Sequence, residues 1–221
     1  MKGINIFLAN GFEDIEALAV NDVLRRGGVP VQLVAIGDEP FVTSSHGVTI
    51  GVENFLEDMD LSADSTCSRD VMIFPGGMPG SKNLAACGKL VKAMKEHYAA
   101  GGTVAAICAA PGLVLGQLDD LQGVEFTCFD GFEGYLEAKG AKFVPAPALT
   151  SGRIVTGRSA GYAVEFGLEI LKQILKQSRI VVRDDVVQDD GRQDDGKQEE
   201  GKQEDKVQAV RNAMLLKTIG Q

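Results

Sequence analysis

The sequence predicts an α/β sandwich, in which a mostly parallel β-sheet is covered by helices on both faces. Short continuous apolar runs, typical of strands buried on both faces, alternate with segments whose apolar residues recur every three or four positions, as in helices. The first strand–helix–strand unit closes within about 35 residues, which implies parallel strands joined by a right-handed crossover. The chain has 221 residues, 44% of them hydrophobic, enough for one domain with a sizeable core.

The predicted elements follow one another with short connections, and glycines or turn sequences separate them. In the first half they are a strand at residues 4–9, a helix at 14–26, a strand at 31–36, a hairpin at 39–52, a polar loop at 53–69, a strand at 70–74 and a helix at 81–100. In the second half they are a strand at 103–107, a helix from 109, a strand at 123–129, a helical turn at 133–138, a strand at 142–144, a hairpin formed by 149–150 and 154–156, and a helix at 162–175.

The composition changes abruptly near the C-terminus. Residues 188–206 form a five-residue tandem repeat with eight acidic and four basic residues and no apolar ones. A glycine every five residues opposes helix formation, so we expect a solvated loop; an acidic interaction segment is the alternative. Apolar spacing then returns. We therefore predict an α/β domain over 1–183, an acidic, disordered loop over 184–206 and a docking helix over 207–221.

Composition also excludes several function classes. The formal net charge of −9 argues against nucleic acid as the main partner. No run approaches the ~20 apolar residues of a membrane span, and the N-terminus lacks a cleavage-site pattern, so a cytoplasmic location is expected. The four cysteines form no CxxC pair, and there are only two histidines. These counts, and the absence of GxGxxG and GxxxxGK[ST] patterns, predict free thiols, no metal site and no cofactor.

Residues 103–112 place Cys108 at the joint between a strand and a helix. Small residues lie two positions before and after it, which is the layout of a nucleophile elbow with alanines in place of the usual glycines. A helix N-terminus lowers the pKa of a thiol, and the next backbone N–H can donate to an oxyanion. The sequence therefore favours Cys108 as a nucleophile. The alternative is a small hydrophobic residue buried at a strand end.

Two other loops should meet Cys108, because sites in such folds form outside the carboxyl ends of the strands. The first carries Glu16, either as a carboxyl facing the thiol or as an acid favoured by the helix dipole. If protonated, Glu16 donates a hydrogen bond to a thiolate; if charged, it opposes thiolate formation. The second contains Gly76-Gly77, either as part of an oxyanion hole with the N–H of Ala109 or as a plain turn.

The histidines do not complete a catalytic triad. His97 comes late in a helix, and we expect it at the surface. His46 lies near the tip of a hairpin and reaches a site only if loops or a second subunit bring it there. A Cys-His-acid arrangement is therefore not evident. The glycine-flanked loop at 157–161 precedes a helix, and a capped turn is favoured there over an anion site.

Four segments carry a resemblance to a known family. They are Leu-Ala-Asn-Gly-Phe-Glu-Asp-Ile-Glu at 8–16, Phe-Pro-Gly-Gly at 74–77, Ala-Ala-Ile-Cys-Ala-Ala-Pro at 105–111, and the stretch from Thr-Gly-Arg at 156–158 through Glu-Phe at 165–166. In this order they resemble the ThiJ/PfpI superfamily, and specifically its protein deglycase branch, across about residues 1–180. The acidic repeat lies outside the pattern.

The resemblance implies a flavodoxin-like sandwich of the class I glutamine amidotransferase type, and a homodimer. It makes Cys108 the reactive nucleophile, Glu16 its protonated partner, and Gly77 and Ala109 the oxyanion donors.

The resemblance also implies a pocket shared between two subunits, with His46, Arg26 and Phe129 as candidate residues. Members of the branch often carry a histidine near the position of Phe129, which this chain lacks.

The activity implied by the resemblance is that of a glutathione-independent glyoxalase or protein deglycase (a hydrolase or lyase), acting on methylglyoxal, glyoxal or early adducts on proteins. Peptidase activity is not expected, because Ala109 stands where protease-like members have histidine. The alternative is an oxidative-stress sensor, in which Cys108 is oxidised to a sulfinate, or a redox-regulated chaperone.

Overall fold

The computed structural model describes residues 1–62, 66–67, 69–184 and 195–214, and of residues 178–184 and 195–200 it describes the backbone alone. Its centre is a seven-stranded sheet with the order β10-β11-β7-β6-β1-β2-β5. The strands are β1 (Ile4–Leu8), β2 (Val31–Ala35), β5 (Asn54–Phe55), β6 (Val71–Phe74), β7 (Thr103–Ile107), β10 (Ala148–Ser151) and β11 (Ile154–Gly157). All neighbouring pairs are parallel except β10 and β11.

This topology confirms the predicted fold class. The five central parallel strands, numbered by their order in the chain, have the spatial order 2-1-3-4-5, which is that of flavodoxin-like folds. The fold is therefore the flavodoxin-like, class I glutamine amidotransferase-like sandwich. In such sheets the strand order reverses between β1 and the strand next to it, β6, and ligands bind outside the carboxyl ends at that point.

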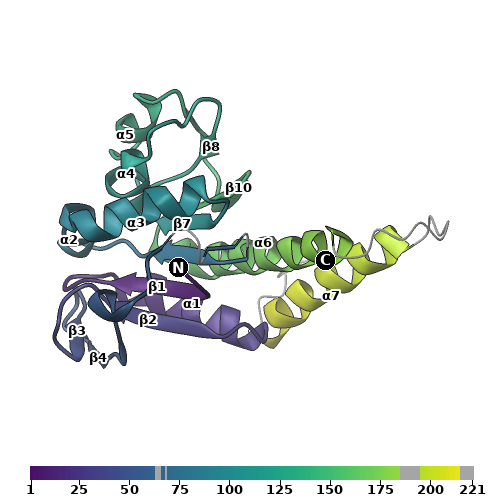
Figure 1. Ribbon diagram of the computed structural model, residues 1–221, viewed down its shortest axis with the longest axis horizontal. Coiled ribbons are helices and arrows are strands. Elements are labelled where there is room, and N and C mark those ends of the chain that lie inside the picture. Colours follow the sequence, from purple (N-terminus) through teal and green to yellow (C-terminus); the bar gives the residue numbers. More distant parts are fainter. Residues whose placement is uncertain (63–65, 68, 185–194, 215–221) are drawn as a thin grey trace.

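Two hydrophobic cores lie on opposite faces of the sheet, because successive side chains of a strand point to opposite sides. In β1, Ile4, Ile6 and Leu8 belong to one core, and Phe7 belongs to the other. The first core is closed by α1 (Asp14–Arg26) and α6 (Ala163–Asp184). The second is closed by α2 (Gly80–Ala86), α3 (Gly88–Ala99), α4 (Ala110–Leu113) and α5 (Gly134–Glu137). Figure 1 shows these two helical layers on either side of the strands.

Three predicted elements differ in detail. The helix expected at 81–100 is two helices, because the backbone is extended at Cys87, between α2 and α3. The expected strand at 123–129 is only β8 (Glu125–Phe126), paired with β9 (Lys142–Phe143) apart from the main sheet. The expected loop at 53–69 contains strand β5 and a 3-10 turn (Leu56–Asp58). The hairpin of β3 (Phe41–Thr43) and β4 (Thr49–Gly51) forms as predicted.

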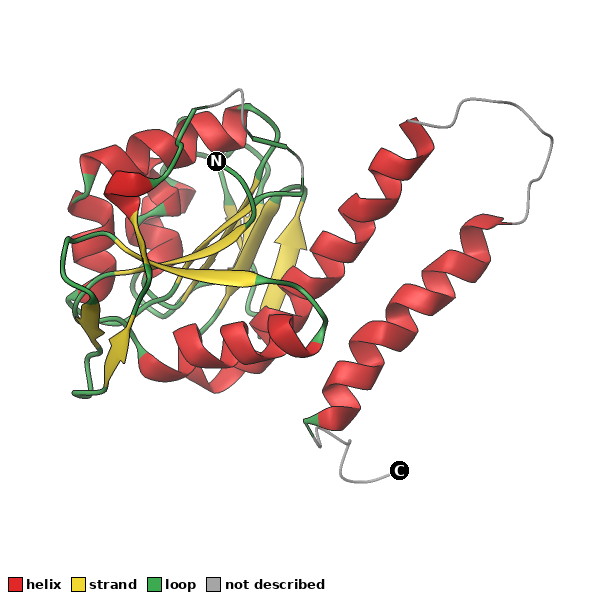
Figure 2. Ribbon diagram, turned by 60° about the horizontal axis from the view of Figure 1, so that its bottom comes forward, coloured by secondary structure: helices red, strands yellow, loops and turns green. Residues whose placement is uncertain are grey.

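The prediction of a loop over 184–206 is wrong for its second part. Helix α7 (Asp195–Ala213) begins inside the repeat, while residues 185–194 lie outside the described part of the chain. Figure 2 shows α7 running back beside α6. Gln203 donates from Nε2 to the carbonyl oxygen of Leu175 at 2.7 Å, and Val207 and Val210 pack on the first core. These tertiary contacts outweigh the helix-opposing glycines. Among the described helices, none is both long and apolar enough to span a membrane.

Candidate functional site

The backbone at Cys108 has the geometry of a nucleophile elbow. Cys108 joins β7 to α4 with φ at 65°, and it is the one non-glycine with positive φ in the described part of the chain. A side chain in this left-handed region is strained and persists only where neighbours fix the backbone. Here the N–H of Cys108 donates to the carbonyl of Gly157 at 3.0 Å, and its own carbonyl accepts from the N–H of Phe129 at 2.8 Å. The end of β11 and the loop that carries Phe129 therefore hold the turn.

The carboxyl of Glu16 reaches this turn from the first turn of α1. The residue is 1% exposed. Its Oε2 accepts a hydrogen bond from the N–H of Gly76 at 2.7 Å, and the carboxyl lies near enough to the Cys108 thiol to raise the pKa of that thiol. The other oxygen, Oε1, is buried and has no nitrogen or oxygen partner among the described residues. The predicted meeting of these loops thus occurs, and one carboxylate oxygen is left to take a proton.

The Gly-Gly turn after β6 lets these groups approach one another. A Cβ at Gly76 would overlap the Glu16 carboxylate and lie 2.6 Å from the Cβ of Cys108. Gly77 has φ at 88°, and a Cβ there would lie 2.6 Å from the carbonyl oxygen of Gly11. The backbone N–H groups of Gly77 and Ala109 face the Cys108 side chain and act to lower the pKa of its thiol. The N–H of Gly76 is engaged by Glu16 and is therefore not available as an oxyanion donor.

Burial and mutual charge set the protonation of the pair. Burial is the largest cause that raises the pKa of Glu16, to about 7, against the hydrogen bond from Gly76. Burial, and then the charge of Glu16, raise the pKa of the Cys108 thiol to about 12, against the N–H groups of Ala109 and Gly77. At neutral pH the thiol therefore keeps its proton, and Glu16 is the base placed to remove it.

This result overturns the expectation that the helix after the elbow lowers the pKa of Cys108. Helix α4 has only four residues, so its dipole is small. Burial of the thiol, and then the charge of the nearby Glu16 carboxylate, act in the opposite direction and raise the pKa of Cys108.

The three residues predicted for a shared pocket lie in different places. Phe129 borders Cys108 through its backbone and exposes 47% of its surface. Arg26 is at the far end of α1, roughly 15 Å from Glu16 along the helix axis, and pairs with Asp22. Within one chain the structure therefore separates Arg26 from Cys108. His46 contacts Asp14, with Nδ1 2.7 Å from Oδ2.

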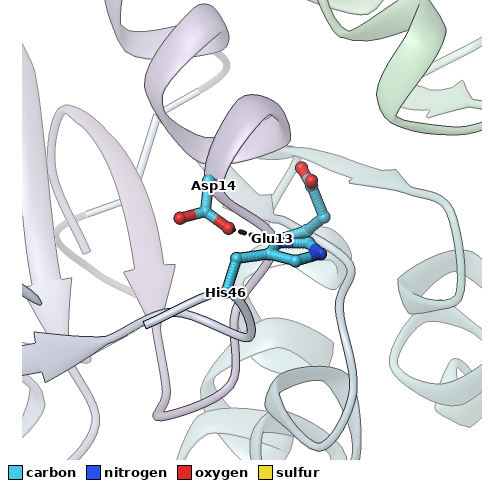
Figure 3. Close-up of side chains that lie close together, drawn as sticks. All are labelled: Glu13, Asp14 and His46. Carbon is cyan, nitrogen blue, oxygen red and sulfur yellow. Dashed lines mark hydrogen bonds and ion pairs between the residues drawn. The ribbon is translucent and has the colours of Figure 1, made fainter. Parts of the chain in front are cut away.

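Figure 3 shows His46 together with Glu13 and Asp14, a group of metal-ligating side chains that sequence reasoning did not assemble. Their ligand atoms lie within 4.8 Å of one another. Glu13 also caps α1, because its Oε2 accepts from the N–H of Glu16 at 2.8 Å. Neither the charge pattern nor the residue spacing of the sequence indicates that His46 lies beside Asp14, because His46 is on a hairpin 32 residues further along the chain.

The surface position expected for His97 is wrong. The side chain is 1% exposed, and Nε2 lies 2.9 Å from the carbonyl oxygen of Thr103. Burial lowers the pKa of His97. The signal was present in the sequence: His97 continues the buried stripe of Leu90, Ala93 and Met94 at helical spacing. His97 is therefore a buried residue of α3 that bonds to the start of β7, and it is not part of the site.

Comparison with known proteins assigns the chain to a family. Protein DJ-1 homolog A of Arabidopsis thaliana is 34% identical over 178 residues, which are 80% of this chain and 44% of that protein. The chain thus spans less than half of this relative, and the same holds for homolog B of that plant. The glutathione-independent glyoxalase DJR-1.2 of Caenorhabditis elegans is 30% identical over 162 residues, or 73% of this chain and 82% of that protein.

Structural comparison gives the same result. The crystal structure of Drosophila melanogaster DJ-1beta superposes with a TM-score of 0.74 at 26% identity and covers 97% of both chains. A model of the DJ-1/PfpI family matches residues 2–173, the α/β sandwich that carries Cys108 and Glu16. The chain therefore belongs to the DJ-1/PfpI family.

Proposed function

We propose that this chain is a cysteine-dependent enzyme that acts on methylglyoxal, glyoxal or their early adducts on proteins. The observation that carries the proposal is the strained elbow that holds the Cys108 thiol against the buried Glu16 carboxyl, with Gly76 between them. A relative of 30% identity is named a glutathione-independent glyoxalase, which supports the same class of reaction.

The proposed first step is attack of the Cys108 sulfur on the aldehyde carbon. Glu16 accepts the thiol proton as the carbon–sulfur bond forms, because a base with a pKa of about 7 suits proton transfer near neutral pH. The product is a hemithioacetal, and we assign the N–H groups of Gly77 and Ala109 to the alkoxide that forms.

The following steps need no oxidant. The C1 hydrogen of the hemithioacetal leaves as a proton while the neighbouring carbonyl carbon gains one, so one carbon is oxidised and the other reduced. Glu16 carries the proton between them. Water then hydrolyses the resulting thioester, which returns the thiol and releases a 2-hydroxy acid: lactate from methylglyoxal, glycolate from glyoxal. In a carbinolamine adduct, the Cys108 sulfur displaces the amine at the carbinol carbon; the carbon–nitrogen bond breaks, the amine leaves with the thiol proton, and the same hemithioacetal goes on to the 2-hydroxy acid.

The test is lactate formation from methylglyoxal by purified wild type, Cys108→Ala and Cys67→Ala. Cys67 is an exposed free thiol and serves as the matched control. We expect Cys108→Ala to fall to the uncatalysed rate while Cys67→Ala keeps wild-type turnover. Full lactate production by Cys108→Ala would refute the proposal.

The oxidation-sensor hypothesis uses the same thiol but has less support. Oxidation by peroxide proceeds through the thiolate. Burial and the Glu16 charge raise the pKa of Cys108 to about 12 and so keep the thiolate population small. Attack assisted by Glu16 does not need a standing thiolate, which is why we favour the enzyme.

The proposal includes a homodimer and a cytoplasmic location. Ile15 and Leu18 on α1, and Val48 in the adjoining hairpin, leave 55%, 37% and 46% of their surfaces exposed, as expected of a face that a second copy covers. All four cysteines are free thiols, as in a reducing compartment.

A further inference from the structure

We propose that Glu13, Asp14 and His46 form a binding site for a divalent transition metal ion, with Zn²⁺ as the test ion, at the N-terminus of α1. The site is distinct from the Cys108–Glu16 pair. It combines two carboxylates from the start of the helix with an imidazole from the β3–β4 hairpin, and Figure 3 shows the His46 ring next to the Asp14 carboxylate, with the Glu13 side chain beside them.

The distances suit such a site. One ligand atom from each residue lies within 4.8 Å of the other two. His46 Nδ1 and Asp14 Oδ2 are 2.7 Å apart, a hydrogen-bond contact, which must open to the roughly 3.4 Å that separates two tetrahedral ligands held at about 2.0–2.2 Å from one ion. Small side-chain rotations are sufficient to admit an ion between them.

The ligands are also oriented by neighbouring groups, as metal ligands usually are. The hydroxyl of Ser44 donates to Oδ1 of Asp14 at 2.5 Å, which leaves Oδ2 toward His46. The carboxylate of Glu13 is anchored through Oε2 by the N–H of Glu16 at 2.8 Å. The hairpin itself is fixed to the helix entry, because the N–H of Ser45 donates to the carbonyl of Phe12 at 2.8 Å.

The donor set selects the class of ion. An imidazole nitrogen favours zinc, nickel, copper or iron over magnesium and calcium, which prefer oxygen ligands throughout. His46 is exposed, so water can complete the coordination. A cation here also compensates the two neighbouring carboxylates, whose charge the single imidazole does not balance. All three ligands belong to one chain, and the site needs no residue from a second copy.

The test uses the imidazole NMR signals of the full-length protein during a Zn²⁺ titration. The chain has two histidines, and the buried His97 is an internal reference. We expect Zn²⁺ to shift the His46 signals and leave those of His97 in place. The Cys108→Ala variant should respond like wild type, which separates this site from metal binding by the reactive thiol and from the proposed enzyme activity.

Three variants identify the ligands. Asp14→Asn and Glu13→Gln should each weaken the Zn²⁺ affinity read at His46 by at least about tenfold, since even the loss of an outer-shell partner costs a metal site about 10- to 100-fold. Asp22→Asn, which removes an exposed carboxylate from the same helix, should bind like wild type. Unshifted His46 signals, or equal affinities for the Asp14→Asn and Asp22→Asn variants, would overturn the proposal and leave a helix cap with an ion pair.

Discussion

Glu16 is the residue whose ionisation should govern the pH dependence of stability. Burial raises its pKa from 4.5 to about 7 in the folded chain. The folded state therefore binds more protons than the unfolded state between these pH values, and the free energy of unfolding falls as pH rises through that window. The full difference corresponds to roughly 3 kcal/mol, reached above pH 7. Below pH 4.5 the carboxyl is protonated in both states, and the penalty is absent.

Glu16→Gln should remove this penalty. The amide has nearly the shape of the carboxyl, and its oxygen can accept the hydrogen bond from Gly76. We expect the variant to gain stability relative to wild type as pH rises from 5 to 8, by up to about 3 kcal/mol. Urea unfolding at several pH values measures this gain. Glu57→Gln, at an exposed glutamate, controls for the lost charge and should show no such gain. A Glu16→Gln difference independent of pH would contradict the buried ionisation.

At this scale, local patterns predicted more than long-range contacts. Cys108 and Glu16 could be singled out because a strand–turn–helix junction and a helix entry are visible in a few consecutive residues. The partners of His46 could not be predicted from consecutive residues, because the hairpin turn contacts the helix only in the folded chain. The predicted direction of the Cys108 pKa shift was wrong for the same reason: the helix was visible in the sequence, whereas the burial of the thiol and the nearby Glu16 carboxylate were not.

Among the elements, α7 depends most clearly on tertiary contacts. Its sequence is mostly charged and polar, and it contains glycines. Val210 is 5% exposed and lies in the first core, with Val207 and Met214 packed beside it. Burial of a side chain of this size contributes about 2 kcal/mol to the free energy of unfolding. These few apolar contacts therefore stabilise a helix whose composition alone does not favour it.

Val210→Asp should release α7. An unpaired carboxylate cannot remain in an apolar contact without a cost of several kcal/mol, so the helix detaches. We expect hydrogen exchange of the amides in 201–214 to lose its protection while β1 and β7 keep theirs. Ala209→Asp adds the same charge one residue away, at an exposed position, and should keep the protection. Unchanged exchange in Val210→Asp would show that other contacts hold the helix.

Element types were predictable where the apolar pattern was long. The buried strands β1, β6 and β7 and helix α1 follow continuous apolar runs or a clear helical period. The division between α2 and α3 was not predictable in this way, because the helical apolar pattern continues across Cys87, where the backbone is extended. Strand β8 is shorter than its apolar run because Thr127 and Cys128 turn toward the elbow, where Phe129 bonds to Cys108.

At the scale of the whole molecule, a helical face is a better candidate surface for self-association than either edge of the sheet. One edge strand, β5, has only two residues. At the other edge, the β8 segment contacts β10, with the N–H of Glu125 donating to the hydroxyl of Ser151 at 3.2 Å. Short or covered edges resist strand pairing between molecules. The exposed apolar side chains of α1 and the β3–β4 hairpin are therefore the better candidates for a dimer interface.

Ile15→Asp should convert the proposed dimer to a monomer. Ile15 is 55% exposed in a single chain, so a charge there leaves the fold intact. In a dimer, a charge buried without a partner at an apolar interface costs several kcal/mol, enough to lower the association constant by more than about 100-fold. Light scattering after size-exclusion chromatography measures the mass directly. Ala138→Asp adds the same charge at an exposed position beside α5, on the opposite face of the sheet, and should remain dimeric. A monomeric wild type would remove the homodimer from the proposed function and leave Cys108 and Glu16 to act within one chain.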